Sequence, residues 1–361
     1  MPVYVLGMDI GGANIKIVSM KIKGREKPEI CSILREYFPL WIHGKKGLEN
    51  KLKELKKRLV TQGMKYAISA CMTAELCDVY RVKREGVLHV ANSLKKTFDD
   101  ALEMYFVSVD RRLIEYEEVL KEPLKVAAAN WAASAYYLER VVAVEKGLKN
   151  CIFIDIGSTT TTIIPIVEGR ADIRGLNDPE KLTWGELVYL GALRSNVVAI
   201  VDKVPYKGLF ARVSTEKFSL SGDVHLVLGK ITSEEYTTET ADGRGVSIRE
   251  AMERLARVPC ADAELLNEYE IKEIARYVYE VEVFKVFEAL VQIRSRIASK
   301  GINPDEFTVI SAGSGDFLIK EAARRAGFKR IIHIDDLVGE RVASIFPAYA
   351  SAIMYVKERY S

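Results

Sequence analysis

The chain has 361 residues, a length that commonly forms about two domains. Its 53 Lys and Arg residues nearly balance its 50 Asp and Glu residues, giving a formal net charge of +3. This near balance gives no support for a nucleic-acid-binding or membrane-surface protein, because both classes usually carry a basic patch. The sequence has no apolar run of about 18 residues, so we expect no transmembrane helix.

Cysteine and histidine usage argues against a zinc site. The five cysteines contain no C-x-x-C pair, and the four histidines are scattered along the chain. Such cysteine usage favours a reducing, cytoplasmic setting. The N-terminal segment MPVYVLGMDIGG has no basic stretch before its apolar run, so we interpret it as a strand and not as a signal peptide.

Strand and helix patterns alternate along most of the chain, which predicts an α/β fold. The first half opens with an apolar strand at 3–8, a tight DIGGAN turn and a second strand at 15–22. Leucines at helical spacing between Leu48 and Leu59 predict an amphipathic helix. Two buried strands and an Ala-rich helix complete this half, at 66–70, 104–110 and 125–143.

The opening pattern recurs in the second half, where the apolar run 151–154 leads into DIGSTT and a second strand at 161–169. This repeat predicts two homologous halves, each beginning with a hairpin whose turn carries an aspartate. A less regular insertion follows at about 175–270. The remaining predicted elements are a helix at 268–299, a strand at 307–311, a glycine-rich turn at 312–317, a helix at 318–326, a strand at 330–335 and a helix at 347–359.

The DIGGAN turn combines residue types that suit a phosphate and a metal ion. Gly11 and Gly12 remove side chains, so backbone N–H groups can approach a phosphate closely. Asp9 ends a buried strand and can hold Mg²⁺ directly or through water. Asn14 and Lys16 complete the predicted phosphate-binding set, in which Lys16 compensates charge. A plain Gly-Gly hairpin is the alternative.

A second turn of the same kind favours the phosphate interpretation. Asp155 matches Asp9, and Gly157 is followed by hydroxyl side chains that can donate to phosphate oxygens. Two halves that face each other would bring both aspartates to one Mg²⁺ and one phosphate chain, which stabilises charge on phosphoryl or diphosphate oxygens. The hydroxyl residues are Ser158, Thr159, Thr160 and Thr161, although Thr160 and Thr162 can instead serve strand pairing.

The third motif is SAGSGDF at 311–317, between a predicted strand and a predicted helix. Its residues Gly313, Ser314 and Gly315 would let a nucleotide base or sugar lie against the backbone at a helix N-terminus. Turns of this kind are frequent between strands and helices, so the motif alone is weak.

The block at 184–196 contains two further candidates for chemistry. If this block is helical, Glu186 and Arg194 lie about two turns apart on nearby faces. Arg194 would bind phosphate or carboxylate, and Glu186 would accept a proton from an attacking hydroxyl. A buried Glu–Arg pair that fixes the insertion to the core is an equally good interpretation. Elsewhere, Asp242 and Arg244 are predicted to lie in a turn, as the Asp-Gly pair indicates. Glu75 is expected at the end of a strand, facing the cleft between the two halves.

The two hairpins and the glycine-rich turn, in this order, resemble the superfamily of actin, sugar kinases, Hsp70 and hydantoinase-type proteins. The resemblance implies two ribonuclease-H-like halves around a central cleft, with phosphate-one and phosphate-two hairpins and an adenosine motif. It places a first half at 1–148, a second half with the insertion at 149–345, and a C-terminal connecting helix at 346–361.

A narrower resemblance rests on eight sequence blocks and points to the archaeal hydantoinase/oxoprolinase-related family linked to C1-transfer pathways. One residue departs from it, because Thr162 stands where the family tends to have Asp. The site is altered if that Asp holds substrate or metal, and unaffected if it only caps the hairpin. The blocks are DIGGANIK, MTAEL (72–76), EGV (85–87), AANW (128–131), DIGSTTT with IIPI (163–166), WGELVYLGALRSN (184–196), TADGRG (240–245) and RLARVPCAD (254–262).

The family resemblance implies a Mg²⁺-dependent transferase of methanofuran biosynthesis. It would join an (aminomethyl)furan-methyl diphosphate to γ-glutamyltyramine and release diphosphate, without requiring ATP. From the motifs above, the candidate catalytic residues for this reaction are Asp9, Asp155, Glu186 and Arg194, with both aspartates as metal ligands. We expect small-molecule substrates as partners, with no nucleic acid and no membrane.

Other functions could use the same hairpins. An ATP-dependent hydantoinase/oxoprolinase-type hydrolase or a sugar-kinase-like phosphotransferase would hold ATP, and the glycine-rich turn favours a nucleotide. A kinase also needs a catalytic aspartate near its acceptor hydroxyl, for which Asp110 is the candidate. A non-catalytic nucleotide sensor ranks last, because the sequence has no helix-turn-helix and no basic patch.

Overall fold

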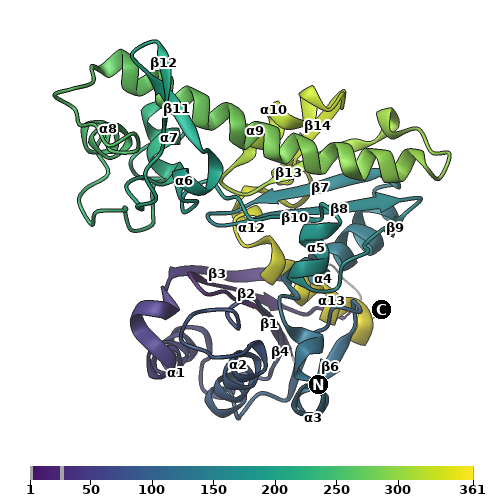
Figure 1. Cartoon of the computed structure of the whole chain (residues 1–361). Coiled ribbons are helices and arrows are strands. Elements are labelled where there is room, and N and C mark those ends of the chain that lie inside the picture. The colour runs from purple at the N-terminus through teal and green to yellow at the C-terminus, as the bar shows by residue number, and fades with distance from the viewer. Residues whose placement is uncertain (1–2, 25–27, 361) are drawn as a thin grey trace. The chain divides into compact units, whose positions relative to one another are not determined.

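The computed structural model describes residues 3–24 and 28–360. Its contacts divide the chain into two compact units. Figure 1 shows their helices and strands. Unit 1 comprises Met1–Lys149, Ile166–Asp178 and Ile334–Ser361, and unit 2 comprises Asn150–Pro165 and Pro179–His333.

The first sheet has the strand order β3-β2-β1-β4-β5-β6. β1 runs antiparallel to β2 and parallel to β4, and β5 extends the parallel part. The register of the first hairpin pairs Asp9 with Lys16. The strands are β1 (Tyr4–Ile10), β2 (Asn14–Lys21), β3 (Glu29–Tyr37), β4 (Tyr66–Met72), β5 (Glu103–Val107) and β6 (Leu113–Glu115).

Alternate side chains of β1 face opposite sides of the first sheet. Leu6, Met8 and Ile10 are fully buried in a core with leucines of α1 (Leu40–Leu59) and valines of α2 (Lys83–Thr97). Because side chains alternate along a strand, Gly7 and Asp9 face the opposite side.

Helix α13 (Phe346–Tyr360) packs on that opposite side. A Cβ at Gly7 would lie 2.2 Å from the Ala348 carbonyl oxygen, so only glycine permits this approach. The hydroxyl of Ser69 donates to the Ser351 carbonyl at 2.7 Å, and the hydroxyl of Ser351 donates to the Ser69 carbonyl at 2.9 Å. Small side chains in the first part of α13, residues 346–354, therefore allow the helix to pack closely against the sheet.

The second sheet has the order β10-β8-β7-β13-β14, with β9 paired to β8. β10 is antiparallel to β8, whereas β7, β13 and β14 are mutually parallel in that order. A central strand that continues through an Asp-Gly turn into its neighbour is thus present in both sheets, which confirms the predicted repeat. The strands are β7 (Cys151–Ile156), β8 (Thr161–Val167), β9 (Arg170–Ala171), β10 (Leu187–Val188), β13 (Thr308–Ala312) and β14 (Arg330–His333).

The inserted region of unit 2 packs against the long helix α9 (Glu268–Ala298), which Figure 1 shows in green. Asn267 caps α9 by accepting hydrogen bonds from the amides of Tyr269 and Glu270. Helix α10 (Asp316–Arg325) also packs on α9 and contacts β7 and β13. The inserted elements are α5 (Asp178–Thr183), α6 (Val197–Ile200), β11 (Lys203–Tyr206), β12 (Leu209–Arg212), α7 (Ser221–Val227) and α8 (Ile248–Ala256).

The predicted helix at 125–143 is wrong in detail, and the helical interpretation of the 184–196 block is wrong. The 125–143 segment is divided into a 3₁₀ turn at Pro123–Val126, α4 (Asn130–Tyr137) and a π-helical turn at Leu138–Ala143. Ala128, with φ of 49°, interrupts the helical path. The 184–196 block is not helical, because α5 ends at Thr183 and the chain then forms the short strand β10.

The other helices are short. They are α3 (Tyr116–Lys121), α11 (Asp335–Val338), α12 (Glu340–Ala343) and a 3₁₀ turn at Pro304–Glu306. None of the helices in residues 3–24 and 28–360 combines the length and the apolar character that crossing a membrane requires.

Candidate active site

The first hairpin leaves backbone donors at its tip. The Gly11 amide donates to the Asn14 carbonyl at 3.0 Å and closes the turn between β1 and β2. Within the described residues, the amides of Gly12 and Ala13 donate to no acceptor. A Cβ at Gly12 would meet nothing within 4 Å, so this tip is open. Unused, unobstructed N–H groups are what an anion needs.

Asp9 lies below this tip and is 4% exposed. The Lys16 ammonium lies 3.6 Å from the Asp9 carboxylate. The Cys71 thiol lies 3.9 Å from the other carboxylate oxygen. Burial and then the Asp9 charge raise the pKa of Cys71 well above its usual value, so Cys71 is a neutral thiol and not a nucleophile.

The second hairpin closes in the same way. The Gly157 amide donates to the Thr160 carbonyl at 3.0 Å, and in the described chain the amides of Ser158 and Thr159 have no acceptor. The next segment braces this turn, because the Ala192 amide donates to the Gly157 carbonyl at 2.9 Å. The two Asp-Gly turns are therefore alike in their hydrogen bonding as well as in sequence.

A glycine is required where the bracing segment meets the hairpin. A Cβ at Gly191 would lie 2.3 Å from the Thr159 nitrogen. The amides of Leu193 and Arg194 both donate to the Ser158 carbonyl, at 3.1 and 2.9 Å. The WGELVYLGALRSN block thus supports the second hairpin directly.

The glycine-rich turn lies at the same strand end as Asp155. The Gly315 amide donates to the Ile156 carbonyl at 3.0 Å. A Cβ at Gly313, whose φ is +85°, would lie 2.4 Å from an Asp155 carboxylate oxygen. Unit 2 therefore brings Gly313–Gly315 next to the second hairpin and its Asp155, which the sequence analysis treats as two separate motifs.

Arg194 lies beside the second hairpin, whereas Glu186 does not. The Arg194 guanidinium donates to the Thr159 hydroxyl at 3.3 Å. Glu186 is fully buried, 2.8 Å from the Arg296 guanidinium and 3.9 Å from the Lys181 ammonium. A buried pair was one of the two interpretations of Glu186, but its partner comes from α9 and not from Arg194.

Three other residues named in the sequence analysis lie where they serve the fold and not the group around Asp155. The Thr161 hydroxyl, one of the expected phosphate donors, is buried and donates to the Leu190 carbonyl at 2.7 Å. Thr162 lies on β8 opposite Leu187. Asp110 is exposed at a turn, 3.7 Å from Arg112.

Glu75 is a buried acid, although its sequence position predicted a strand end facing the cleft. Its side chain is 1% exposed, and one carboxylate oxygen has no hydrogen-bond partner. Its pKa is raised to about 7, chiefly by burial and also by the Asp178 charge, while backbone hydrogen bonds and the Lys83 charge oppose this rise. A Cβ at Gly86 would lie 2.5 Å from the Glu75 Cα. A hydrogen bond from the Ala128 backbone lowers the pKa of the Glu75 carboxyl. The MTAEL, EGV and AANW blocks therefore meet at Glu75.

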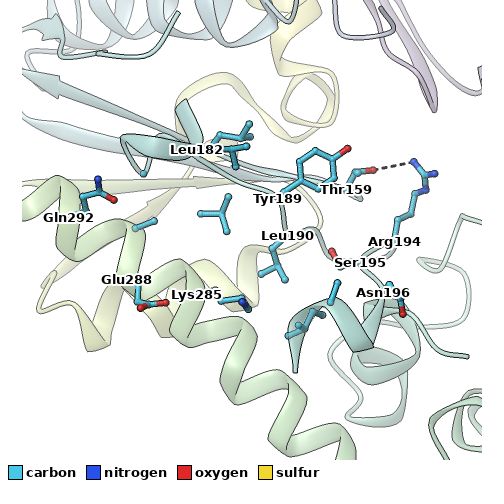
Figure 2. A pocket seen from close by; sticks show the side chains of 16 residues that line it. Thr159, Leu182, Tyr189, Leu190, Arg194, Ser195, Asn196, Lys285, Glu288 and Gln292 are labelled. Atoms are coloured by element: carbon cyan, nitrogen blue, oxygen red, sulfur yellow. Dashed lines mark hydrogen bonds between the residues drawn. The ribbon is translucent and has the colours of Figure 1, made fainter. Parts of the chain in front are cut away.

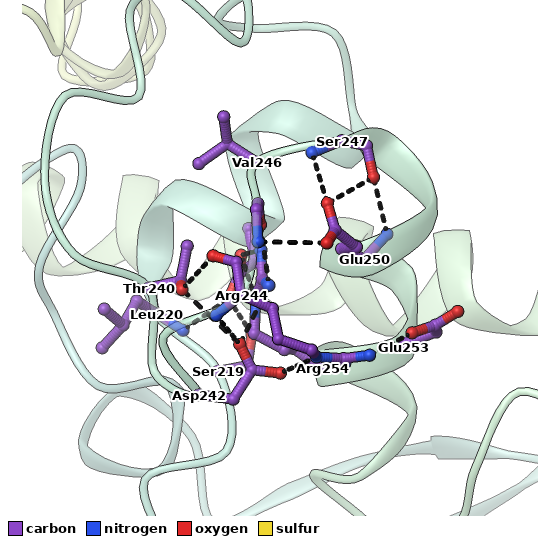
Figure 3. Close-up of polar contacts among 12 residues, drawn as sticks. Ser219, Leu220, Thr240, Asp242, Arg244, Val246, Ser247, Glu250, Glu253 and Arg254 are labelled. Carbon is purple, nitrogen blue, oxygen red and sulfur yellow. Dashed lines mark hydrogen bonds and ion pairs between the residues drawn. The ribbon is translucent and has the colours of Figure 1, made fainter.

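The TADGRG and RLARVPCAD blocks form one polar network inside the insertion (Figure 3). The fully buried Arg254 donates twice to one oxygen of Asp223, at 2.9 and 2.8 Å. It also donates to Asp242 at 3.2 Å and to the Gly245 carbonyl at 3.0 Å. Arg244 pairs with Asp242 at 2.7 Å. This network explains both blocks as structure of the insertion.

The predicted Mg²⁺ would need ligands from more than the protein. Among the described residues, no group of three or more His, Cys, Asp or Glu side chains could hold a metal ion. Mg²⁺ usually takes one or two carboxylates together with waters and substrate phosphates, so the single carboxylate beside each hairpin fits that mode.

The sheet order and the two hairpins define a protein with ribonuclease-H-like halves of the actin, sugar-kinase and Hsp70 type. A nucleotide-free structure of acetone carboxylase shares this fold, with a TM-score of 0.59 and 12% identity over 97% of this chain and 70% of that chain. The chain belongs to the hydantoinase/oxoprolinase family, whose profile matches residues 67–357.

Two curated relatives carry the same name, (4-{4-[2-(gamma-L-glutamylamino)ethyl]phenoxymethyl}furan-2-yl)methanamine synthase. The protein from Methanocaldococcus jannaschii is 33% identical over 358 residues, which is 99% of both chains. The protein from Methanococcus vannielii is 32% identical over 213 residues, covering 58% of this chain and 92% of that protein.

Proposed function

We propose that the protein is a synthase of methanofuran biosynthesis that joins an (aminomethyl)furan-methyl diphosphate to γ-glutamyltyramine and releases diphosphate. The 33% identity over 99% of both chains carries this proposal. The name of that relative describes a furan-methanamine linked through a phenoxymethyl ether to a γ-glutamylaminoethyl group. Such an ether is the product expected from these two substrates.

In the proposed reaction the phenol oxygen attacks the methylene carbon on the furan. A carbon–oxygen bond to the phenol forms, while the bond from that carbon to diphosphate breaks and its electron pair leaves with diphosphate. The phenol proton passes to a carboxylate. Charge therefore grows on diphosphate oxygens, and groups that stabilise this charge lower the barrier.

The chain offers donors of the right kind for those oxygens. The amides at the two hairpin tips have no other acceptor in the described chain, and Arg194 and Thr159 add side-chain donors in unit 2. Asp9 and Asp155 are the proposed Mg²⁺ ligands, and a bound Mg²⁺ would neutralise leaving-group charge. Glu186 is fully buried and ion-paired, so we assign it an anchoring role.

An ATP-dependent activity of the hydantoinase type is the second candidate. The observation that favours it is the Gly313–Gly315 turn, which packs on the strand end that carries Asp155. A nucleotide held there would have its phosphates near the second hairpin.

The deciding experiment follows diphosphate and ADP release in parallel, with and without ATP. We expect diphosphate release with Mg²⁺, the furan diphosphate and γ-glutamyltyramine alone, because the leaving group already carries the activation. Release should stop when γ-glutamyltyramine is omitted. Product that forms only with ATP, with ADP in equal amount, would establish the second candidate and exclude the first.

A further inference from the structure

Unit 2 contains a cavity of about 660 Å³ beside the second hairpin. This volume lies within the roughly 300–1,000 Å³ range of small-molecule sites. Figure 2 shows α9 along one side and the segment from Tyr189 to Asn196 along the other. Its apolar lining residues are Leu182, Leu187, Val188, Leu190, Ala199, Ile200 and Ala289.

The α9 side of the cavity carries one positive and one negative side chain. Lys285 and Glu288 are three positions apart, which places them on the same helix face. In the described chain, neither of these two side chains forms an ion pair or a hydrogen bond. Lys285 is partly buried and Glu288 is exposed, so both charges are accessible to a ligand in the cavity and neither is neutralised by another side chain.

The wall beside these charges is held in place. The Gln292 amide donates to the Thr183 carbonyl at 2.9 Å and so ties α9 to the end of α5. A Cβ at Gly185, with φ of +68°, would lie 2.7 Å from the Gln292 amide oxygen. The hydrogen bond and this close approach therefore fix the position of α9 relative to the end of α5 at this part of the cavity wall.

A different part of the lining suits an anion. Arg194 and Thr159 line the cavity and are joined by a hydrogen bond of 3.3 Å, seen in Figure 2 away from Lys285 and Glu288. Thr159 belongs to the second hairpin, where we place donors to diphosphate. The cavity thus offers a pair of opposite charges, an apolar middle and an approach to the hairpin.

We propose that this cavity binds the acceptor substrate, a phenol that carries a γ-glutamyl group. Its free α-carboxylate pairs with Lys285, its α-ammonium pairs with Glu288, and its ring packs on the apolar lining. The phenol end then points toward Thr159, where it meets the diphosphate-bearing carbon. This inference rests on the proposed function, since it names the pocket for one of the two proposed substrates.

The test combines a change in the protein with a change in the substrate. Lys285→Met and Glu288→Gln are each assayed with γ-glutamyltyramine and with tyramine, which lacks the α-amino acid group. We expect KM for γ-glutamyltyramine to rise roughly 10- to 100-fold, the usual loss for a hydrogen bond to a charged group. The values of kcat and KM for tyramine, and KM for the furan diphosphate, should stay unchanged. Lys272→Met, on α9 but outside the cavity lining, is the control.

Calorimetric titration of γ-glutamyltyramine into the protein alone separates this inference from the proposed function. Binding by the wild type that both variants lose supports the pocket, even if no product forms. Product formation with unchanged KM in both variants, or an equal loss for tyramine and γ-glutamyltyramine, overturns the pocket and leaves the proposed function intact. Unfolding midpoints equal to that of the wild type show that the variants are folded.

Discussion

Glycine is required at position 313 for two separate reasons. Its φ of +85° is a conformation that L residues rarely adopt, and a Cβ there would meet the Ile156 carbonyl oxygen at 2.3 Å and the Asp155 carboxylate at 2.4 Å. The sequence predicted the turn but not this contact, because strand β7 and the turn lie far apart in the chain.

Gly313→Ala should therefore destabilise the protein and displace Asp155. Gly301→Ala is the matched control, since Gly301 has a φ of +75° with nothing within 4 Å of a Cβ. We expect a loss of about 1 kcal/mol in unfolding free energy for Gly301→Ala. Gly313→Ala should lose a further 1–3 kcal/mol or so from the forced contact. Equal losses in chemical unfolding would show that the contact is relieved at no cost.

Glu75 should make stability depend on pH. Its pKa rises from 4.5 to about 7 on folding, chiefly through burial. Between these values the folded state binds more protons than the unfolded state, so the unfolding free energy falls as pH rises from about 4.5 to 7. The shift corresponds to about 3 kcal/mol at pH 8.

The neutral variant Glu75→Gln removes this charge. Unfolding midpoints of the wild type and the variant should be compared at pH 5 and pH 8. The unfolding midpoint of the variant should rise relative to that of the wild type as pH rises, because only the wild type must ionise a buried acid. A difference between the two proteins that stays constant with pH would mean that Glu75 titrates at its ordinary pKa.

Residue-level prediction succeeded where the chemistry is local and failed where it depends on distant partners. Asp9 with Lys16 and the two hairpin turns follow from short motifs, and the structure shows each motif as a closed turn. Glu186 finds Arg296, a residue 110 positions away, and no local pattern signals such a pair. Glu75 carries a signal only in hindsight, because three sequence blocks meet there.

At the scale of elements, the insertion depends on a buried ion pair between α7 and α8. Arg254 and Asp223 are both fully buried, and the second Asp223 oxygen accepts from the Ser219 hydroxyl and the Leu220 amide, each at 3.0 Å. Strongly periodic elements such as α9 were predicted closely. The small helices of the insertion were not, because polar contacts between segments fix them and hydrophobic periodicity does not.

Arg254→Met should unfold the insertion or weaken it strongly. It leaves the Asp223 carboxylate buried without its partner, which typically costs about 3–5 kcal/mol. Arg249→Met, on the same helix, removes an ion pair from a side chain that is 89% exposed and should change stability by less than about 0.5 kcal/mol. Thermal unfolding and protease sensitivity of residues 197–256 provide the measurement. Similar behaviour of both variants would contradict a structural role for the buried pair.

At the scale of the whole molecule, the repeated hairpin raises the question of whether Asp9 and Asp155 serve one metal ion. Asp9→Asn and Asp155→Asn keep the side-chain shape but lose the charge. If each carboxylate helps to hold Mg²⁺, each variant should lose roughly 100-fold or more in kcat, about 3 kcal/mol of transition-state stabilisation. Asp110→Asn, at an exposed turn, should keep the wild-type rate; a large loss there would favour a kinase-like reaction.

The double variant Asp9→Asn/Asp155→Asn decides between one shared site and two independent ones. Groups that act as a unit show strongly non-additive losses, whereas independent groups show losses that multiply. We expect the double variant to be little slower than the slower single variant, and we expect all three to need more Mg²⁺ for half-maximal rate. Losses that multiply, with each single variant keeping the wild-type Mg²⁺ dependence, would mean that the two carboxylates do different work and that the repeat does not build one metal site.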